Sequence, residues 1–162
     1  MTKDNAPPPP WTRDEIQFWS IVYIQAPREK VFEHLVNGEF TKQFYLGMPI
    51  SNPTETGQKL WFGDSEDDPA IVGEVKEFRP PERFSHTFRF PFFDDPESLV
   101  EFGLFDESPE LTAMIVRHSG FESRESMTFT NICGGWPTIL SGLKTLLETG
   151  KPLEFPAEEA TQ

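Results

Sequence analysis

GGWPTILSGLKTLLETG, residues 134–150, is the stretch that decides the fold. Its apolar residues repeat at the i, i+3, i+4, i+7 spacing of one helix face. They are Trp136, Ile139, Leu140, Leu143, Leu146 and Leu147. Pro137 suits a first helical turn and Gly150 suits the position just past a helix end, so we predict a helix between them. A helix with so apolar a face needs a large apolar partner.

The rest of the chain supplies that partner as a series of short strands. Strands are predicted at residues 17–25, 59–62, 70–78, 83–90, 99–105 and 111–118 from β-branched and aromatic content and from alternation. Two short helices are predicted after the first strand, one from Pro27 to Asn37 and one at residues 39–45. Residues 119–129 read as a polar link into the final helix. Consecutive strands joined by short turns predict an antiparallel sheet, with the long helix across its apolar face.

Composition restricts the function classes. The chain carries 14 basic and 27 acidic residues, a formal net charge of −13. This balance argues against binding nucleic acid or an anionic membrane surface, because both require clustered lysine and arginine. The aromatic residues are mostly phenylalanine, 16 against 2 tyrosines, which favours an apolar interior over a hydrated recognition surface.

The domain organisation and compartment are also predicted. We expect a disordered Pro-rich lead at residues 1–14, a single domain at residues 15–152 and a flexible acidic tail at residues 153–162. Cys133 is the only cysteine, which rules out an internal disulfide and fits a reducing compartment. No signal peptide and no membrane-spanning apolar run is recognisable, so the predicted location is cytoplasmic.

Several segments together resemble the START-like (SRPBCC) superfamily, in its AHSA-like branch of activators of the ninety-kilodalton heat-shock protein's ATPase. The resemblance covers residues 16–150 approximately. Its segments are PREKVFEHL at 27–35, FYLG at 44–47, GEV at 73–75 through PPERF at 80–84, HSGF at 118–121, and Gly135-Trp136 with the leucines that follow.

This resemblance implies an α+β helix-grip (START/Bet v 1-like) fold, in which a curved antiparallel sheet wraps around a long C-terminal helix. It also implies a cavity for an apolar ligand. It does not imply one function, because the superfamily includes lipid carriers, cyclases, hydrolases and co-chaperones. The true co-chaperones place a separate domain ahead of this one, and this sequence contains nothing that could be that domain.

The titratable residues do not form a recognisable catalytic motif. His34 is expected at the surface of the first helix, whereas His86 and His118 occupy inward strand positions and could meet in the cavity. Hydrogen-bonded structural histidines are favoured over a metal or catalytic pair, because no third ligand lies on those faces. Cys133 lacks a positioned base and is interpreted as structural. We therefore predict no catalytic residue.

The acidic clusters at residues 64–68 and 94–95 are interpreted as solvated turns. They lack the spacing, the glycine and the terminal glutamate of a calcium loop. Gly134-Gly135 lacks the lysine and spacing of a phosphate loop. We accordingly predict no metal site and no cofactor.

The predicted ligand site is the apolar space between sheet and helix. A filled core explains the same aromatic residues on composition alone, but the implied fold favours a pocket with His86 and His118 as its polar anchors. The predicted ligand-binding residues are Trp61, Phe84, His86, Phe88, Phe102, Met114, Val116, His118, Trp136 and Leu140.

Three functional hypotheses follow. The first is a non-catalytic protein that binds a small apolar or aromatic molecule, as a monomer or homodimer. The second is a protein-interaction module, similar to a co-chaperone, that acts on a chaperone ATPase. The third is a cavity-based enzyme of the cyclase or hydrolase type, which would hold a polar group with a strongly displaced pKa in the pocket.

Overall fold

The structure is a computed structural model that describes residues 15–156; the predicted lead at residues 1–14 and residues 157–162 lie outside the described residues. Within these described residues, three helices and six strands follow one another. They are β1 (Phe18–Ile24), α1 (Arg28–Val36), α2 (Gly38–Phe44), β2 (Lys59–Phe62), β3 (Ile71–Arg79), β4 (Arg83–Phe88), β5 (Ser98–Ser108), β6 (Leu111–Ser119) and α3 (Met127–Thr149). The predicted α+β class is confirmed.

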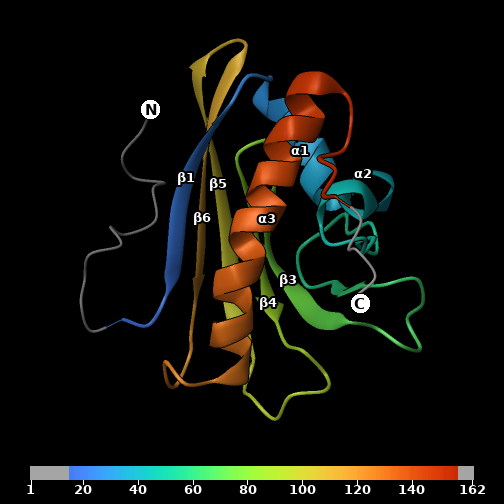
Figure 1. The fold of residues 1–162 in the computed structure, drawn as a ribbon, viewed down its shortest axis with the longest axis vertical. Helices are drawn as coiled ribbons and strands as arrows, with labels where there is room; N and C mark the ends of the chain where they lie inside the picture. The colour runs from blue at the N-terminus through green and yellow to red at the C-terminus, as the bar shows by residue number, and fades with distance from the viewer. Residues whose placement is uncertain (1–14, 157–162) are drawn as a thin grey trace.

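The six strands form one antiparallel sheet in the order β1-β6-β5-β4-β3-β2. Strands β2 to β6 are a simple meander, and β1 joins it at the β6 edge (Figure 1). Strands β1 and β2 are consecutive strands in sequence but lie at opposite edges. Helices α1 and α2 make the connection between them and contact α3 at one end of the sheet.

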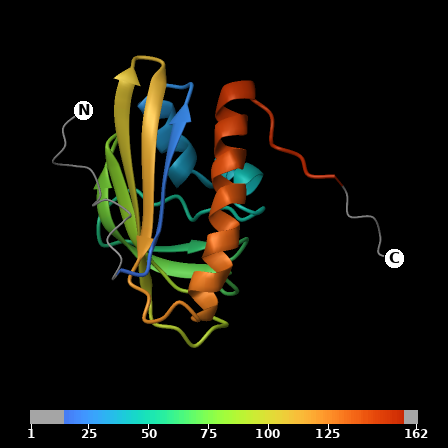
Figure 2. The same cartoon turned by 60° about the vertical axis from the view of Figure 1, so that its left-hand side comes forward.

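Helix α3 runs lengthwise along one face of the sheet (Figure 2). Strand alternation sends every second side chain toward it. The cross-strand partners Val22 and Met114 point inward, as do Phe84 and Phe102, and the aromatic rings of this inner face fill most of the space under α3. The predicted helix-grip fold is therefore confirmed.

The start of α3 differs from the prediction. The helix begins at Met127, not near Pro137, so residues 127–129 of the expected polar link are helical. Ser126 caps the helix by accepting a hydrogen bond from the Phe129 backbone N–H at 3.0 Å. The apolar period does extend back through Ile132, but Gly134-Gly135 and Pro137 obscured it because all three are poor residues for a helix interior. Burial of Ile132 and Trp136 against the sheet offsets that cost.

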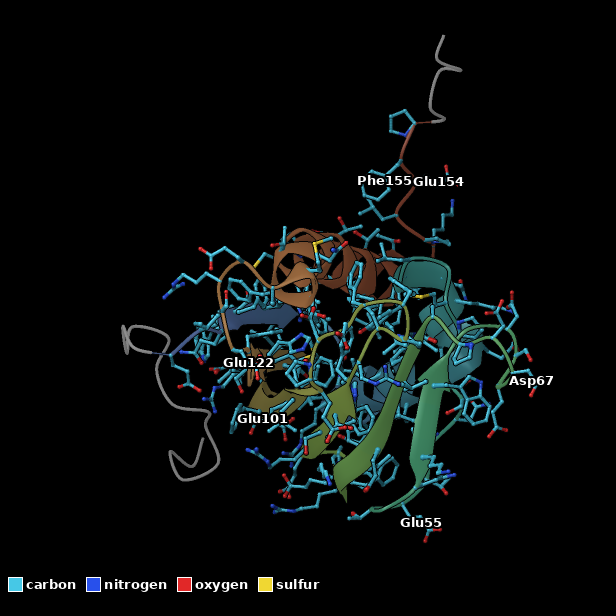
Figure 3. The ribbon with its side chains drawn as sticks, turned by 90° about the horizontal axis from the view of Figure 1, so that it is seen from below. Glu55, Asp67, Glu101, Glu122, Glu154 and Phe155 are labelled. Carbon is cyan, nitrogen blue, oxygen red and sulfur yellow. The ribbon has the colours of Figure 1, made fainter. Side chains whose placement is uncertain are left out.

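Close packing and capping explain two glycines of α3. A Cβ on Gly142 would lie 3.2 Å from Phe44 Cβ, so this glycine lets α2 approach the helix. Gly150 follows the last residue with a φ of 77°, and its N–H bonds to the Leu146 carbonyl. This is the left-handed C-terminal cap that glycine favours. The chain then leads away from the body, with Phe155 exposed (Figure 3).

His34 is not at the surface, contrary to expectation. It is buried, its ring stacks on Phe40 with ring centroids 3.9 Å apart, and its Nδ1 lies 2.9 Å from the Lys30 carbonyl. Helix α2 covers it because the Asn37 cap turns α2 back beside α1. Within residues 15–156, no helix is long and apolar enough to cross a membrane.

The packing of α3 predicts a large cost for truncating its central leucine. Leu143 is fully buried in the core, so Leu143→Ala should lower the free energy of unfolding by about 2–5 kcal/mol. Ser141→Ala on the exposed side of the same helix is the matched control and should change it by less than about 0.5 kcal/mol. Urea denaturation followed by circular dichroism measures both values. Equal midpoints for the two variants would contradict this packing.

The interior proline predicts a stabilising substitution. Pro137 is exposed and cannot donate to the Cys133 carbonyl one turn earlier. Inside a helix, alanine is about 3 kcal/mol more favourable than proline. The substitution also gives the unfolded chain more conformational freedom, which reduces the gain in stability by about 0.4–1 kcal/mol. Pro137→Ala should therefore raise the free energy of unfolding by roughly 2 kcal/mol in the same experiment. A loss of stability would show that the proline ring contributes packing that outweighs its backbone cost.

Candidate functional site

A cavity of about 170 Å³ lies between α3, the segment after α2 and the inner face of the sheet. Its wall is almost wholly apolar and comes from three parts of the chain. The lining residues are Tyr45, Leu46, Met48, Ile71, Phe88, Phe90, Asn131, Ile132, Gly135, Trp136 and Ile139. Leu46 and Asn131 are exposed and border the mouth, whereas Tyr45 and Trp136 are buried.

The helical wall of the cavity follows from the period of α3. Ile132, Gly135, Trp136 and Ile139 are spaced i, i+3, i+4, i+7 and so share one face of the helix. Gly135 has no side chain and thereby leaves room at the mouth, where its nearest neighbour is the side chain of Leu46. Opposite the helix, Ile71 of β3 and Phe88 of β4 form the floor of the cavity.

Trp136 forms the inner end of the cavity and is held by a hydrogen-bond chain. Its indole Nε1–H donates to Nδ1 of His118 at 3.0 Å. Ser98 Oγ lies 2.7 Å from Nε2 of His118 and donates to the Phe88 carbonyl at 3.2 Å. The Ser98 hydroxyl proton is thus committed to Phe88, so His118 donates from Nε2 to Ser98 and accepts from Trp136 at Nδ1. All members of the chain are satisfied only when His118 is neutral.

The environments of the two inward histidines disfavour their charged forms. Burial lowers the pKa of His86 to about 4, partly opposed by a hydrogen bond to the Thr87 carbonyl at 2.8 Å. Burial, and then repulsion from His86, hold the pKa of His118 well below its usual value. Contrary to expectation, the two rings do not meet. Val100 lies between them in the strand register, because it is the cross-strand partner of both histidines. Each makes its own backbone or side-chain hydrogen bonds instead.

Tyr45 lines the cavity and carries a polar group. Its ring stacks on Phe62 with centroids 4.4 Å apart and meets Trp136 edge-on at 5.9 Å. Its hydroxyl is buried and has no hydrogen-bond partner. Burial also raises the pKa of Tyr45 above its ordinary value, so the hydroxyl keeps its proton at neutral pH. A buried hydroxyl without a partner is costly, and a bound acceptor would remove that cost.

The predicted ligand-binding residues occupy three different environments. Phe88 and Trp136 line the cavity. Phe84, His86, Phe102, Met114, Val116, His118 and Leu140 are buried in the packed core and do not line it. Trp61 alternates to the opposite face of the sheet, where it borders an open cleft of about 550 Å³ beside Arg89. Of the predicted residues, the structure thus places Phe88 and Trp136 at the cavity and most of the others deeper in the core.

Sequence reasoning missed most of the wall. Tyr45, Leu46 and Met48 lie at and beyond the end of the helix predicted at residues 39–45. Ile132 and Gly135 lie before Pro137, where the final helix is predicted to start. One signal was available. FYLG at residues 44–47 is one of the segments that resemble the family, and its tyrosine is one of only two in the chain.

Other candidate chemistry finds no support in the geometry. Partial burial raises the pKa of the Cys133 thiol, so it does not have the lowered pKa of an activated nucleophile. Among residues 15–156, no group of three histidine, cysteine, aspartate or glutamate side chains is placed to hold a metal ion. Asp95 has a structural contact, since it accepts from the backbone N–H and hydroxyl of Thr128 in the first turn of α3.

The comparisons with known proteins agree with this architecture. The sequence model of one family, described as Activator of Hsp90 ATPase homolog 1-like protein, matches residues 25–148. A comparison with curated proteins finds no match.

Three solved structures show the same fold. DynU16, a protein from the dynemicin biosynthetic locus, is 23% identical with a TM-score of 0.69, over 87% of this chain and 50% of DynU16. PFC0360w, an HSP90 activator from Plasmodium falciparum, is 16% identical with a TM-score of 0.68, over 85% and 98% of the two chains. The Aha1 dimer from Colwellia psychrerythraea is 18% identical with a TM-score of 0.69, over 84% and 98%. This chain thus spans half the length of DynU16.

The buried histidines predict a loss of stability in mild acid. Below pH 6.5 the unfolded chain gains protons at His86 that the folded chain does not gain until about pH 4, so the free energy of unfolding falls as pH falls. The slope reaches about 1.4 kcal/mol per pH unit for each such proton. Carboxylates with a lowered pKa, such as Glu77, begin to lose their stabilising effect about one pH unit above their usual value of 4.5, where the unfolded chain starts to bind protons, so the interval from about 5.5 to 6.5 reports on histidine.

Urea denaturation at several pH values in that interval measures the slope. His86→Gln removes one titrating group and should flatten the slope by up to one proton, whatever its effect on absolute stability. His118→Gln should flatten it as well and should also destabilise at neutral pH, because Trp136 loses its acceptor. An unchanged slope in both variants would contradict the assignment of neutral buried histidines.

Proposed function

The chain belongs to the family of Activator of Hsp90 ATPase homolog 1-like proteins, and from that premise we propose that it binds a small apolar or aromatic molecule carrying one hydrogen-bond acceptor. The observation that carries this proposal is the apolar cavity beside Trp136, which is lined in part by Tyr45, a residue whose hydroxyl is buried and unpartnered. An apolar pocket with a single polar group is how many small-molecule sites achieve both affinity and orientation.

The volume limits the size of the bound group. A cavity of about 150 Å³ in another protein holds benzene, so about 170 Å³ accommodates one substituted aromatic ring or a short aliphatic chain. A longer molecule would leave through the mouth between Leu46 and Asn131. There it would meet Phe90, whose ring contacts the exposed Phe92 at a centroid distance of 5.3 Å.

The polar chemistry limits the ligand in a second way. Because the Tyr45 hydroxyl stays protonated, it acts as a donor toward a carbonyl, ether or hydroxyl oxygen. The indole N–H of Trp136 is already committed to His118 and offers the ligand only its ring. The site is therefore built to select an uncharged molecule, since a charged group would pay a large desolvation cost in this wall.

The interaction-module hypothesis is the alternative, with a chaperone ATPase as the partner. Its support is the filling of the deeper space by His118, Phe102 and Trp136, which leaves only a small cavity, together with the family description itself. A cavity-based enzyme would need an acid–base group at the wall. Tyr45 has a displaced pKa, as a residue of such an enzyme would, but burial raises it further from neutrality, and burial lowers the pKa of the histidines in the same unhelpful sense. None of these groups exchanges a proton near neutral pH, and this favours binding over proton transfer.

Ligand binding predicts paired effects of two probes. Acetophenone carries a carbonyl acceptor, and ethylbenzene has a similar shape without one. Both should shift the indole resonance of Trp136 and quench its fluorescence, and acetophenone should bind more tightly. Tyr45→Phe should weaken acetophenone about 2- to 12-fold, the value of one net hydrogen bond, and leave ethylbenzene unchanged. Titration followed by nuclear magnetic resonance measures both affinities.

Filling the cavity provides the control. Ile139→Trp adds volume at the wall and should abolish both shifts, whereas Thr145→Ala on the same helix, away from the cavity, should leave them intact. If neither probe perturbs Trp136 while the protein accelerates a chaperone's ATP hydrolysis, binding in the cavity is wrong and the interaction-module hypothesis replaces it.

A further inference from the structure

The face of the sheet turned away from α3 carries an apolar patch at the β1 edge. The register places Tyr23, Ala113 and Phe105 in one row across β1, β6 and β5. Ile21 and Ile115 form the next row. We call Trp19, Ile21, Tyr23, Phe105, Ala113 and Ile115 the outer apolar patch. Ile21 and Tyr23 are 36% and 50% exposed. Among residues 15–156, Trp19 is the one partly buried apolar side chain that packs against the buried members.

Two donors at one end of this patch have no acceptor. Nε1 of Trp19 and Nε2 of Gln17 are both buried and make no hydrogen bond. The Gln17 side chain is held through its oxygen, because Oε1 accepts a hydrogen bond from Arg117 at 2.7 Å. Arg117 also pairs with Glu101, which lies on this face (Figure 3). Two buried N–H donors without partners raise the free energy of the folded state. An acceptor that carries no N–H of its own would satisfy them without bringing another unpaired donor to this apolar surface.

The sequence that leads into β1 contains acceptors of this kind. Residues 7–10 are four consecutive prolines, followed by Trp11, and they lie outside the described residues. Proline has no N–H, so a proline run cannot pair as a strand and leaves its carbonyls free as acceptors. Proline-rich segments are bound by aromatic surfaces that add N–H donors to such carbonyls. The outer apolar patch offers aromatic rings and two such donors.

The chain before β1 is also long enough for the proline run to reach the outer apolar patch. Glu15, the first described residue, already pairs with Arg117 beside the patch. From Asp14 back to Pro7 the chain can span roughly 22 Å at about 3.1 Å per residue. The seven residues of β1 extend about 23 Å at about 3.3 Å per residue, so the segment can return along the whole strand. Attachment to β1 also gives it an effective concentration of order millimolar, which a second copy of the chain lacks.

We propose that residues 7–11 dock in cis on the outer apolar patch, with Trp19 Nε1 and Gln17 Nε2 donating to proline carbonyls. The docked segment covers Ile21 and Tyr23. It also lies beside the free edge of β1, where a proline run blocks pairing with a strand of another molecule.

Nuclear magnetic resonance of the full chain tests this proposal. In the natural sequence, proline side-chain protons should show Overhauser contacts to the rings of Trp19 and Tyr23, and the Trp19 indole N–H should be protected from exchange with water. Replacing Pro7, Pro8, Pro9 and Pro10 by Gly-Ser-Gly-Ser should remove the contacts and lower the protection about tenfold, the effect of losing one hydrogen bond. The Trp136 indole resonance should not move, which verifies the fold.

The matched control replaces Thr2, Lys3, Asp4 and Asn5 by the same Gly-Ser-Gly-Ser sequence and should change nothing at Trp19. Mixing isotope-labelled and unlabelled full chains separates the two sources of contact. Contacts seen only between differently labelled molecules would overturn docking in cis in favour of a second copy. Absence of the contacts in the natural sequence, or unchanged Trp19 protection after proline replacement, would overturn the proposal altogether.

Discussion

The hydrogen bond from the Trp136 indole to His118 is the contact on which the rest of the structure depends. It joins α3 to β6 near the end of that strand, and its length of 3.0 Å fixes how closely the helix can approach. His118 is in turn fixed by Ser98 at the start of β5, and Ser98 by Phe88 at the end of β4. A single polar chain thus holds three strands and the helix in one arrangement. The surrounding rings of Phe18, Tyr45 and Phe102 exclude water, which makes each bond in it stronger and its loss more costly.

The same contact determines where the cavity lies. Trp136 occupies the volume under the middle of α3 that a curved sheet and a helix would otherwise enclose. The open space is displaced toward the segment after α2, where Gly135 contributes no side chain and Tyr45 closes one side. The result is a small apolar site near the surface. The filled interior stabilises the fold, while the displaced cavity leaves room for one ring-sized group, and Trp136 takes part in both.

The sequence predicted the layers of this protein better than the position of its cavity. Strand alternation located residues such as Phe84 and Val116 on the inner face, because the period of a strand is fixed by backbone geometry alone. The start of α3 was wrong because Gly134-Gly135 and Pro137 indicate a helix boundary locally, and only the burial of Ile132 and Trp136 in the tertiary structure overrides them. The depth of the cavity was unpredictable for a related reason. Whether a buried ring fills a space depends on the side chain opposite, here His118 against Trp136, and periodicity cannot report such a pairing.

The topology also determines the order in which the strands can pair as the chain leaves the ribosome. Phe18 of β1 pairs with His118 of β6, one hundred residues later, whereas β2 to β6 each pair with a neighbour made moments before. At a synthesis rate of about 5–20 residues per second, β1 waits roughly 5–20 s for its only partner strand. Throughout that delay Trp19, Ile21 and Tyr23 have neither β6 nor its side chains beside them. The meander can assemble first from local contacts, and β1 must then be added at its edge before α3 can close over both.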